Sequence, residues 1–175
     1  MKVNQFFLCA ISLSLMVMSC DKEPTTPTPE PIKIGDKMEG GTVIYLDATG
    51  EHGIVMASET SDLFVWGCEG VDIPGTSPLI GKGQANTTLI LTCSESTMAK
   101  FCDNYESGGF SDWYMPSKNE VALLYEYHKS NNILWQGSAS STQADATYAY
   151  GLDGNGTSGA APKSMKYYTI PCRSF

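Results

Sequence analysis

The stretch GGFSDWYMPSKNEVALLY, residues 108–125, follows one segment with a helical pattern and runs into a second, and its own pattern decides how the chain folds. Ser117 and Glu120 have the spacing of a capping box. In that motif the serine hydroxyl accepts a hydrogen bond from the backbone N–H three residues on, and the glutamate accepts one from the serine N–H. The proline that follows Met115 disfavours helical backbone at that methionine. The stretch therefore predicts an extended entry that buries Trp113 and Met115, followed by a helix.

Residues at helical spacing precede this stretch and also occupy its last part. Before it they are Met98, Phe101, Cys102 and Tyr105, and from its last part onward they are Val121, Leu124, Tyr125 and His128. Ser94 or Ser96 can cap the upstream helix, and Gly108 can end it. The sequence therefore predicts two helices joined through the quoted stretch, with Cys102 on the buried side of the first.

The rest of the chain favours strands and turns. Two β-rich runs, residues 42–46 and 53–57, surround the turn DATGEHG and predict a hairpin. Residues 62–93 are rich in Gly, Pro, Asp and Asn, and we expect a long structured loop there. After the second helix, ILWQGSASST, ATYAYGLDG and KSMKYYTIPCRSF read as short strands. Two helices among antiparallel strands indicate an α+β domain.

The N-terminal segment predicts export and lipidation. A 13-residue apolar run, residues 6–18, is shorter than the ~20 residues of a membrane helix and suits a cleaved signal. The ending VMSC resembles a bacterial lipobox. We therefore expect residues 1–19 to be removed and Cys20 to carry a lipid. An ordinary secretory signal or a short anchor is the alternative.

Domain organisation follows from composition. Residues 20–31 are rich in Pro and Thr and predict an extended tether, which leaves residues 32–175 as one domain. Asp21 and Glu23 resemble the acidic export tags of bacterial surface lipoproteins. We therefore expect an outer-membrane anchor in the bacterial cell envelope, with the domain exposed on the surface.

Charge limits the partners. Removing the signal gives a formal charge of about −9, from 10 basic and 19 acidic residues. No run of Lys or Arg is present. Nucleic acid, anionic headgroups and sulfated polysaccharides are therefore disfavoured, because each needs a basic surface.

The cysteines predict disulfides. Four remain in the domain: Cys68, Cys93, Cys102 and Cys172. An even number in an exported domain predicts two disulfides, with three pairings open. A four-thiolate zinc site is the alternative, but the chain has no Cys-x-x-Cys pair.

Catalytic motifs are not apparent. His52 and His128, the two histidines, lie in no metal-binding pattern, and no Ser or Cys occupies a recognisable nucleophile turn. The segment DGNGT, residues 153–157, has part of a calcium-loop pattern without its glutamate, and a hairpin turn is the simpler interpretation. We therefore expect a binding protein that needs no cofactor, with calcium as an alternative.

Candidate ligand-binding residues gather after the second helix. Aromatic side chains there offer flat faces to sugar rings, and polar ones can hydrogen-bond to hydroxyls. They are Trp135, Gln136, Asp145, Tyr148, Tyr150, Asp153 and Asn155. Strand packing and ordinary turns are the alternative for each.

Several stretches together resemble the Lcl C-terminal domain family, named after a bacterial collagen-like adhesin. They are IGDKMEGGTVIYLDATGEHGIVMA, WGCEGVDIPGT, IGKGQANTTLIL, GGFSDWYMPSKNEVALLY, SSTQADATYAYGLDGNG and CRSF, and the resemblance covers residues 34–175. It implies a C-type-lectin-like fold with two helices flanking antiparallel sheets. It also implies a disulfide from Cys102 to Cys172, which leaves Cys68 with Cys93.

The resemblance further implies attachment to host glycans. The sugar-site tripeptides and the Trp-Asn-Asp triplet of calcium-dependent lectins are absent, and the negative charge does not suit a glycosaminoglycan. Formylglycine-generating enzymes share the lectin-like fold, but their cysteine motif is not visible. We therefore expect a binding or adhesion module for extracellular glycan or glycoprotein. The alternative is a structural or assembly lipoprotein that docks onto a neighbouring surface protein.

Overall fold

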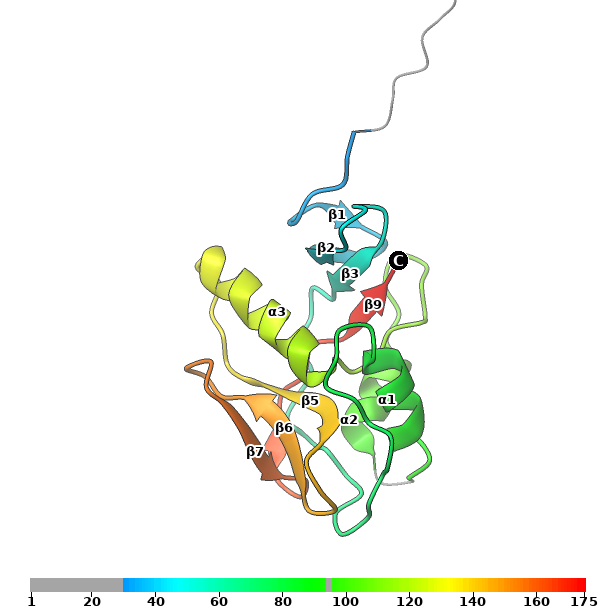
Figure 1. Cartoon of the computed structure of the whole chain (residues 1–175), viewed down its shortest axis with the longest axis vertical. Helices are drawn as coiled ribbons and strands as arrows, with labels where there is room; N and C mark the ends of the chain where they lie inside the picture. Colours follow the sequence, from blue (N-terminus) through cyan, green and yellow to red (C-terminus); the bar gives the residue numbers. More distant parts are fainter. Residues whose placement is uncertain (1–29, 94–95) are drawn as a thin grey trace, which may run out of the picture. The chain divides into compact units, whose positions relative to one another are not determined.

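The computed structural model describes residues 30–93 and 96–175 (Figure 1). Residues Pro31–Phe175 form one compact unit. The expected signal peptide, the lipidation at Cys20, nearly all of the tether and the capping role of Ser94 lie outside the described residues. None of the helices within them has the length and apolar character needed to cross a membrane.

The first sheet joins the two ends of this unit. Its four antiparallel strands have the order β1 (Lys37–Met38), β2 (Gly41–Leu46), β3 (Gly53–Met56) and β9 (Cys172–Ser174). The predicted hairpin is confirmed as β2 and β3, with Thr42 opposite Met56. Both strands are largely buried, because β9 covers the edge of β3 and helix α3 contacts β2.

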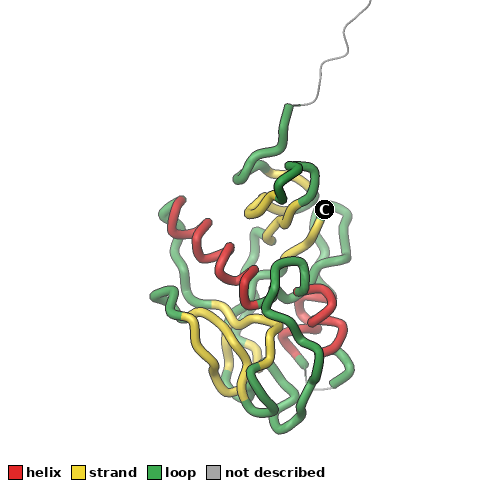
Figure 2. The backbone as a smooth tube through the Cα atoms, viewed as in Figure 1, coloured by secondary structure: helices red, strands yellow, loops and turns green. Residues whose placement is uncertain are grey.

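Two further sheets follow. Strands β5 (Ser138–Gln143), β6 (Tyr148–Leu152) and β7 (Ser158–Pro162) form an antiparallel meander. Strands β4 (Phe64–Val65) and β8 (Lys166–Tyr167) pair as a short ribbon. Figure 2 shows the strands of the described chain in separate groups, with α3 (Lys118–Ser130) contacting both β2 and β5. The fold is therefore a mixed helix and antiparallel-sheet domain, as the sequence predicts.

The quoted stretch has the expected structure. Ser117 caps α3, accepting from the Glu120 N–H at 3.4 Å while its own N–H donates to Glu120 Oε2 at 2.7 Å. Trp113 and Met115 are fully buried. Tyr114 between them pairs with Cys172 of β9, with backbone bonds of 2.8 and 2.9 Å.

The same stretch connects the two hydrophobic clusters of the domain. Trp113 packs in the cluster formed by β2, β3 and α3, whereas Met115 packs in the cluster that surrounds Cys102. Three consecutive residues therefore tie both clusters to the last strand, which explains why this segment governs the fold.

The described residues contain three helices where the sequence predicted two. The predicted first helix is α2 (Thr97–Asp103), and the additional one is α1 (Gly83–Ile90), in the region expected to be a loop. Helix α1 escaped prediction because its buried face is partly polar. Asn86 Nδ2 donates to Ser77 O at 2.8 Å, and Thr87 Oγ1 donates to Gly83 O at 2.8 Å.

Helix α2 also differs in its ends. It stops at Asp103 rather than near Gly108, and Tyr105 beyond it packs edge-on against Trp113, with 5.1 Å between ring centroids. Ser96 occupies the N-cap position, but its hydroxyl donates to Cys93 O instead of capping the helix.

One expected disulfide is present and the other is not. Cys68 and Cys93 are bonded, whereas Cys102 and Cys172 are free, fully buried thiols. The expectation of two disulfides is therefore corrected to one within the described residues. The two thiols pack in different clusters, and each has its own polar neighbour, Thr169 for Cys102 and the Ile170 carbonyl for Cys172.

Candidate functional site

A pocket of about 470 Å³ lies against the β5–β6–β7 sheet. Strands β6, β7 and β8 contribute to its lining, together with the start of β5 and two residues that flank β4, Leu63 and Trp66. We call it the β6–β7 pocket. Its volume falls in the range of small-ligand sites, which are concave and mostly apolar with a few polar groups.

Small residues keep the pocket open. Strand β7 reads SGAAP, and the facing positions of β6 include Ala149 and Gly151. A side chain added at Gly159 would meet no atom within 4 Å, so this glycine faces open space. The concavity is therefore a direct consequence of the composition of β6 and β7.

Four aromatic residues are among those that line the pocket: Trp66, Tyr150, Tyr167 and Tyr168. The Tyr150 ring lies on the α3 face of the sheet, so this residue borders the pocket through its backbone. The three tyrosines are half-buried, and burial raises the pKa of Tyr167. The Lys118 ammonium lies 4.1 Å from the centroid of the Tyr150 ring, and therefore occupies one face of that ring. Such rings can stack on an apolar ligand face while their hydroxyls reach water.

Trp66 is held in place from two sides. Its indole N–H donates to Ser140 O at 2.8 Å, and the Lys163 ammonium lies 4.7 Å from its ring centroid. Lys163 is itself buried and donates to Val71 O at 3.0 Å and to Gln143 Oε1 at 2.7 Å. Burial lowers the pKa of Lys163, and the neighbouring Asp145 and Asp72 oppose that shift. These contacts fix the tryptophan in the pocket lining.

Polar groups are few among the lining residues. Gln136, Asp153 and Lys166 are exposed side chains that line it, with the hydroxyls of Thr157 and Ser158. Asp153 Oδ1 accepts from the N–H groups of Asn155 at 2.9 Å and Thr157 at 2.8 Å. The segment DGNGT is therefore a hairpin turn held by its first residue. The described residues contain no group of three His, Cys, Asp or Glu side chains suited to a metal ion.

The structure brings together three of the seven predicted ligand-binding residues. Gln136, Tyr150 and Asp153 line the pocket. Trp135 lies instead in the core at 9% exposure, where its indole N–H donates to Asp153 O at 2.7 Å. Its ring packs edge-on against His128, with 5.3 Å between centroids. Trp135 therefore stabilises the turn at residues 153–157 from the core of the domain.

The other three predicted residues lie outside the pocket lining. Asp145 Oδ1 accepts from the N–H groups of Thr147 and Tyr148, which closes the β5–β6 turn. Tyr148 is 40% exposed, and the Asn155 carbonyl accepts from the Tyr125 hydroxyl at 3.3 Å.

Sequence reasoning missed Trp66, Lys166, Tyr167 and Tyr168 as pocket residues. Trp66 belongs to the segment expected to be a loop, and the pairing of β4 with β8 is not encoded in any local pattern. One feature of the sequence could have indicated these pocket residues: the run KYYT at residues 166–169, in which two adjacent tyrosines follow a lysine.

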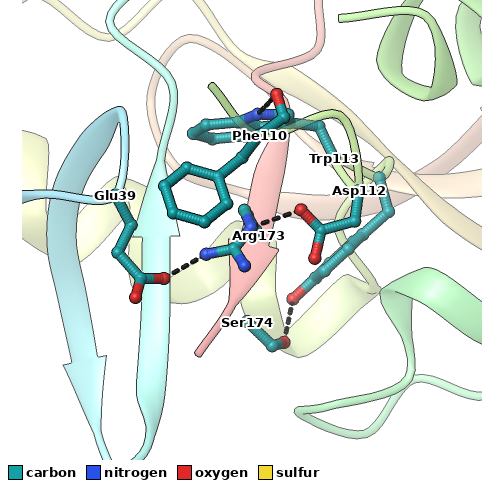
Figure 3. A network of polar contacts seen from close by, with 7 residues as sticks. Glu39, Phe110, Asp112, Trp113, Arg173 and Ser174 are labelled. Carbon is teal, nitrogen blue, oxygen red and sulfur yellow. Dashed lines mark hydrogen bonds and ion pairs between the residues drawn. The ribbon is translucent and has the colours of Figure 1, made fainter. Parts of the chain in front are cut away.

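A charged network lies at the other sheet and has a structural role. Figure 3 shows Arg173 of β9 between Glu39 and Asp112, bonded to both. The guanidinium carbon lies 3.9 Å from the centroid of the Phe110 ring. The network joins the β1–β2 turn, the segment before Trp113 and the last strand. Its one guanidinium is ion-paired with both carboxylates.

In comparisons with known proteins, no family model matches the chain and no curated protein matches it.

Proposed function

We propose that this protein is a surface-exposed lipoprotein whose domain binds extracellular glycan or glycoprotein through the β6–β7 pocket. Cys20 carries the lipid, and the outer membrane of a bacterium holds the anchor. The domain acts as a binding or adhesion module and catalyses no reaction. Its fold is C-type-lectin-like in this proposal, and the resemblance to the Lcl C-terminal domain family supports that interpretation.

The observation that carries the proposal is the composition of the pocket. Aromatic residues (Trp66, Tyr167, Tyr168) combine with an amide and a carboxylate (Gln136, Asp153) around about 470 Å³. A sugar presents an apolar C–H face and a rim of hydroxyls, and this set of side chains is complementary to both. Asp153 keeps its second carboxylate oxygen available, because the turn contacts use Oδ1.

A binding screen tests the proposal. The purified protein is screened against a broad panel of glycans and matrix glycoproteins, with and without calcium. We expect at least one neutral or weakly acidic glycan to bind, and calcium to have no effect on its affinity. Gln136→Ala should weaken that binding. Asp153→Asn should weaken it too, while keeping the Oδ1 acceptor that holds the turn. Binding that neither variant changes would place the glycan elsewhere on the domain.

One observation favours the alternative, a structural or assembly lipoprotein that docks onto a neighbouring surface protein. Ile133 and Leu134, in the loop after α3, are 44% and 76% exposed. Adjacent exposed apolar side chains are typical of protein contact sites. If the folded protein binds no member of the glycan and glycoprotein panel, that result would favour this alternative.

A further inference from the structure

The central residue of β7, Ala160, has a backbone N–H and C=O that point away from the sheet. In the β6–β7 ladder, Lys163 N–H donates to Thr147 O at 2.9 Å. Hydrogen-bonded and non-hydrogen-bonded pairs alternate from there, so the pair of Tyr150 and Ala160 is a non-hydrogen-bonded one. The Tyr150 carbonyl agrees with this phase, because it accepts from Ser140 Oγ on the β5 side at 2.8 Å. Neither backbone group of Ala160 has a partner among the described residues.

Ala160 lines the pocket through these backbone groups rather than through its methyl group. Residues directly opposite each other in a sheet share a face, so the Ala160 methyl lies on the face of the Tyr150 ring, beside Lys118 of α3. The pocket lies on the other face, where Ala161 is opposite Ala149. A ligand in the pocket therefore borders the free N–H and C=O of Ala160.

The pocket has an apolar end and a polar end along β6 and β7. Ala149 belongs to the buried cluster of Trp66, and Ala161 lies opposite Ala149, so the lining is apolar at that end. The polar end is formed by the turn at residues 153–157, with its carboxylate and hydroxyl. Ala160 precedes Ala161 in the chain, and its free N–H therefore lies next to the apolar end.

We propose that the pocket holds the acetyl group of a 2-acetamido sugar, which rests on the glycan binding proposed above. The acetyl carbonyl accepts a hydrogen bond from the Ala160 N–H, and the methyl group lies against Ala149, Ala161 and Trp66. A hydroxyl of the same sugar donates to the Ala160 carbonyl. The rest of the ring extends toward the turn at residues 153–157, where polar groups meet its other hydroxyls.

The chemistry of this border favours an acetamido group over other occupants. A free N–H beside an apolar surface matches a carbonyl that carries a methyl group, whereas a sugar hydroxyl there would leave the apolar surface facing water. An amide carbonyl is a stronger acceptor than an ester carbonyl, which disfavours an O-acetyl group. An added peptide strand is disfavoured because Pro162 has no N–H and its carbonyl already accepts from Met165 N–H at 3.1 Å.

Matched sugars test the ligand. N,N′-Diacetylchitobiose and cellobiose share one ring skeleton and differ only in acetamido groups that replace hydroxyls, and N-acetylgalactosamine and galactose make the same comparison. Calorimetric titration of the purified protein should show at least one acetamido sugar binding about tenfold or more tightly than its hydroxyl partner. If other glycans bind but neither acetamido sugar is preferred, the acetyl assignment fails and glycan binding stands. If no glycan binds, both fail.

Three variants of β7 locate the acetyl group. Ala160→Pro removes the free N–H and no bond to β6, and Ala161→Leu fills the apolar end. Each should weaken binding of the preferred acetamido sugar by at least about fivefold. Ala160→Leu is the matched control: it keeps the N–H and places the same side chain on the opposite face, so binding should be unchanged. Equal losses in the two leucine variants, or full binding by Ala160→Pro, would overturn the proposal. If Ala160→Pro does not fold, the two leucine variants decide.

Discussion

The Glu120 carboxylate accepts hydrogen bonds at the N-terminal ends of two helices, α1 and α3. One carboxylate oxygen accepts from the Ser117 N–H in the capping box of α3, and the other accepts from the Gly81 N–H just before α1, both at 2.7 Å. The carboxyl is fully buried, and burial raises its pKa even though these hydrogen bonds oppose the shift. The spacing of Ser117 and Glu120 predicted the cap. The bond to Gly81 was not predictable, because it joins segments 39 residues apart.

The raised pKa of Glu120 predicts a pH dependence of stability. The folded state binds this proton more tightly than the unfolded state, so the free energy of unfolding falls as pH rises from the ordinary glutamate pKa through the raised one. Glu120→Gln keeps a neutral side chain at every pH and removes this contribution. The stability of the unmodified protein relative to Glu120→Gln should therefore increase from pH 8 to pH 4, measured by urea unfolding. A difference that is constant or decreases toward low pH contradicts the assignment.

At the scale of elements, α1 is the helix that the sequence did not predict. The capped, apolar-faced α3 and the hairpin β2–β3 were predicted, because local patterns specify both. Helix α1 has an Asn and a Thr on its buried face, and three β-branched residues in eight positions, so neither periodicity nor propensity reveals it. It forms because tertiary contacts satisfy those polar groups. The pocket was not predicted either, because it also depends on tertiary contacts: β4 and β8 pair although they are far apart in the sequence.

Gly83 provides a test at this scale. Alanine is the better helix former, by about 1 kcal/mol in a helix interior and by less at the first position of α1, which Gly83 occupies; this preference alone would stabilise the helix. A Cβ at position 83, however, would lie 2.4 Å from a Glu120 oxygen and 2.5 Å from the Tyr114 ring. We expect Gly83→Ala to destabilise the protein by about 1–3 kcal/mol through overpacking. Thr88→Ala, at an exposed position of the same helix, should be neutral or stabilising in the same thermal unfolding assay. A stabilised Gly83→Ala would show that α1 does not pack as described.

At the scale of the whole molecule, two hydrophobic clusters are joined by the segment Trp113, Tyr114 and Met115 and by the last strand. Cys102 and Cys172 lie one in each cluster. The structure leaves both as thiols, and burial raises the pKa of both well above the ordinary value. The sequence predicted that all four cysteines are paired. The number of cysteines and the expected export of the domain favour disulfides, but they do not show which thiols lie close enough to bond.

Thiol accessibility tests this arrangement. Cys102 and Cys172 should resist alkylation in the native protein, since both are fully buried and their thiolates are disfavoured. Both should react after denaturation without reductant, as read by peptide mapping. Cys68 and Cys93 should remain unreactive until reduced. Failure of Cys102 and Cys172 to react in the denatured protein would show that they are bonded, as the family resemblance implies.

The central claim is that the β6–β7 pocket binds a glycan, and two tyrosines test it most directly. Tyr167 of β8 lines the pocket and packs against the cluster that contains Trp66 and Ala149, whereas Tyr148 of β6, 40% exposed, does not line it. Calorimetric titration of a glycan from the panel should show Tyr167→Ala weakening binding about tenfold, equivalent to about 1.4 kcal/mol, and Tyr148→Ala leaving it unchanged. Equal affinities for both variants, or a loss confined to Tyr148→Ala, would contradict the claim.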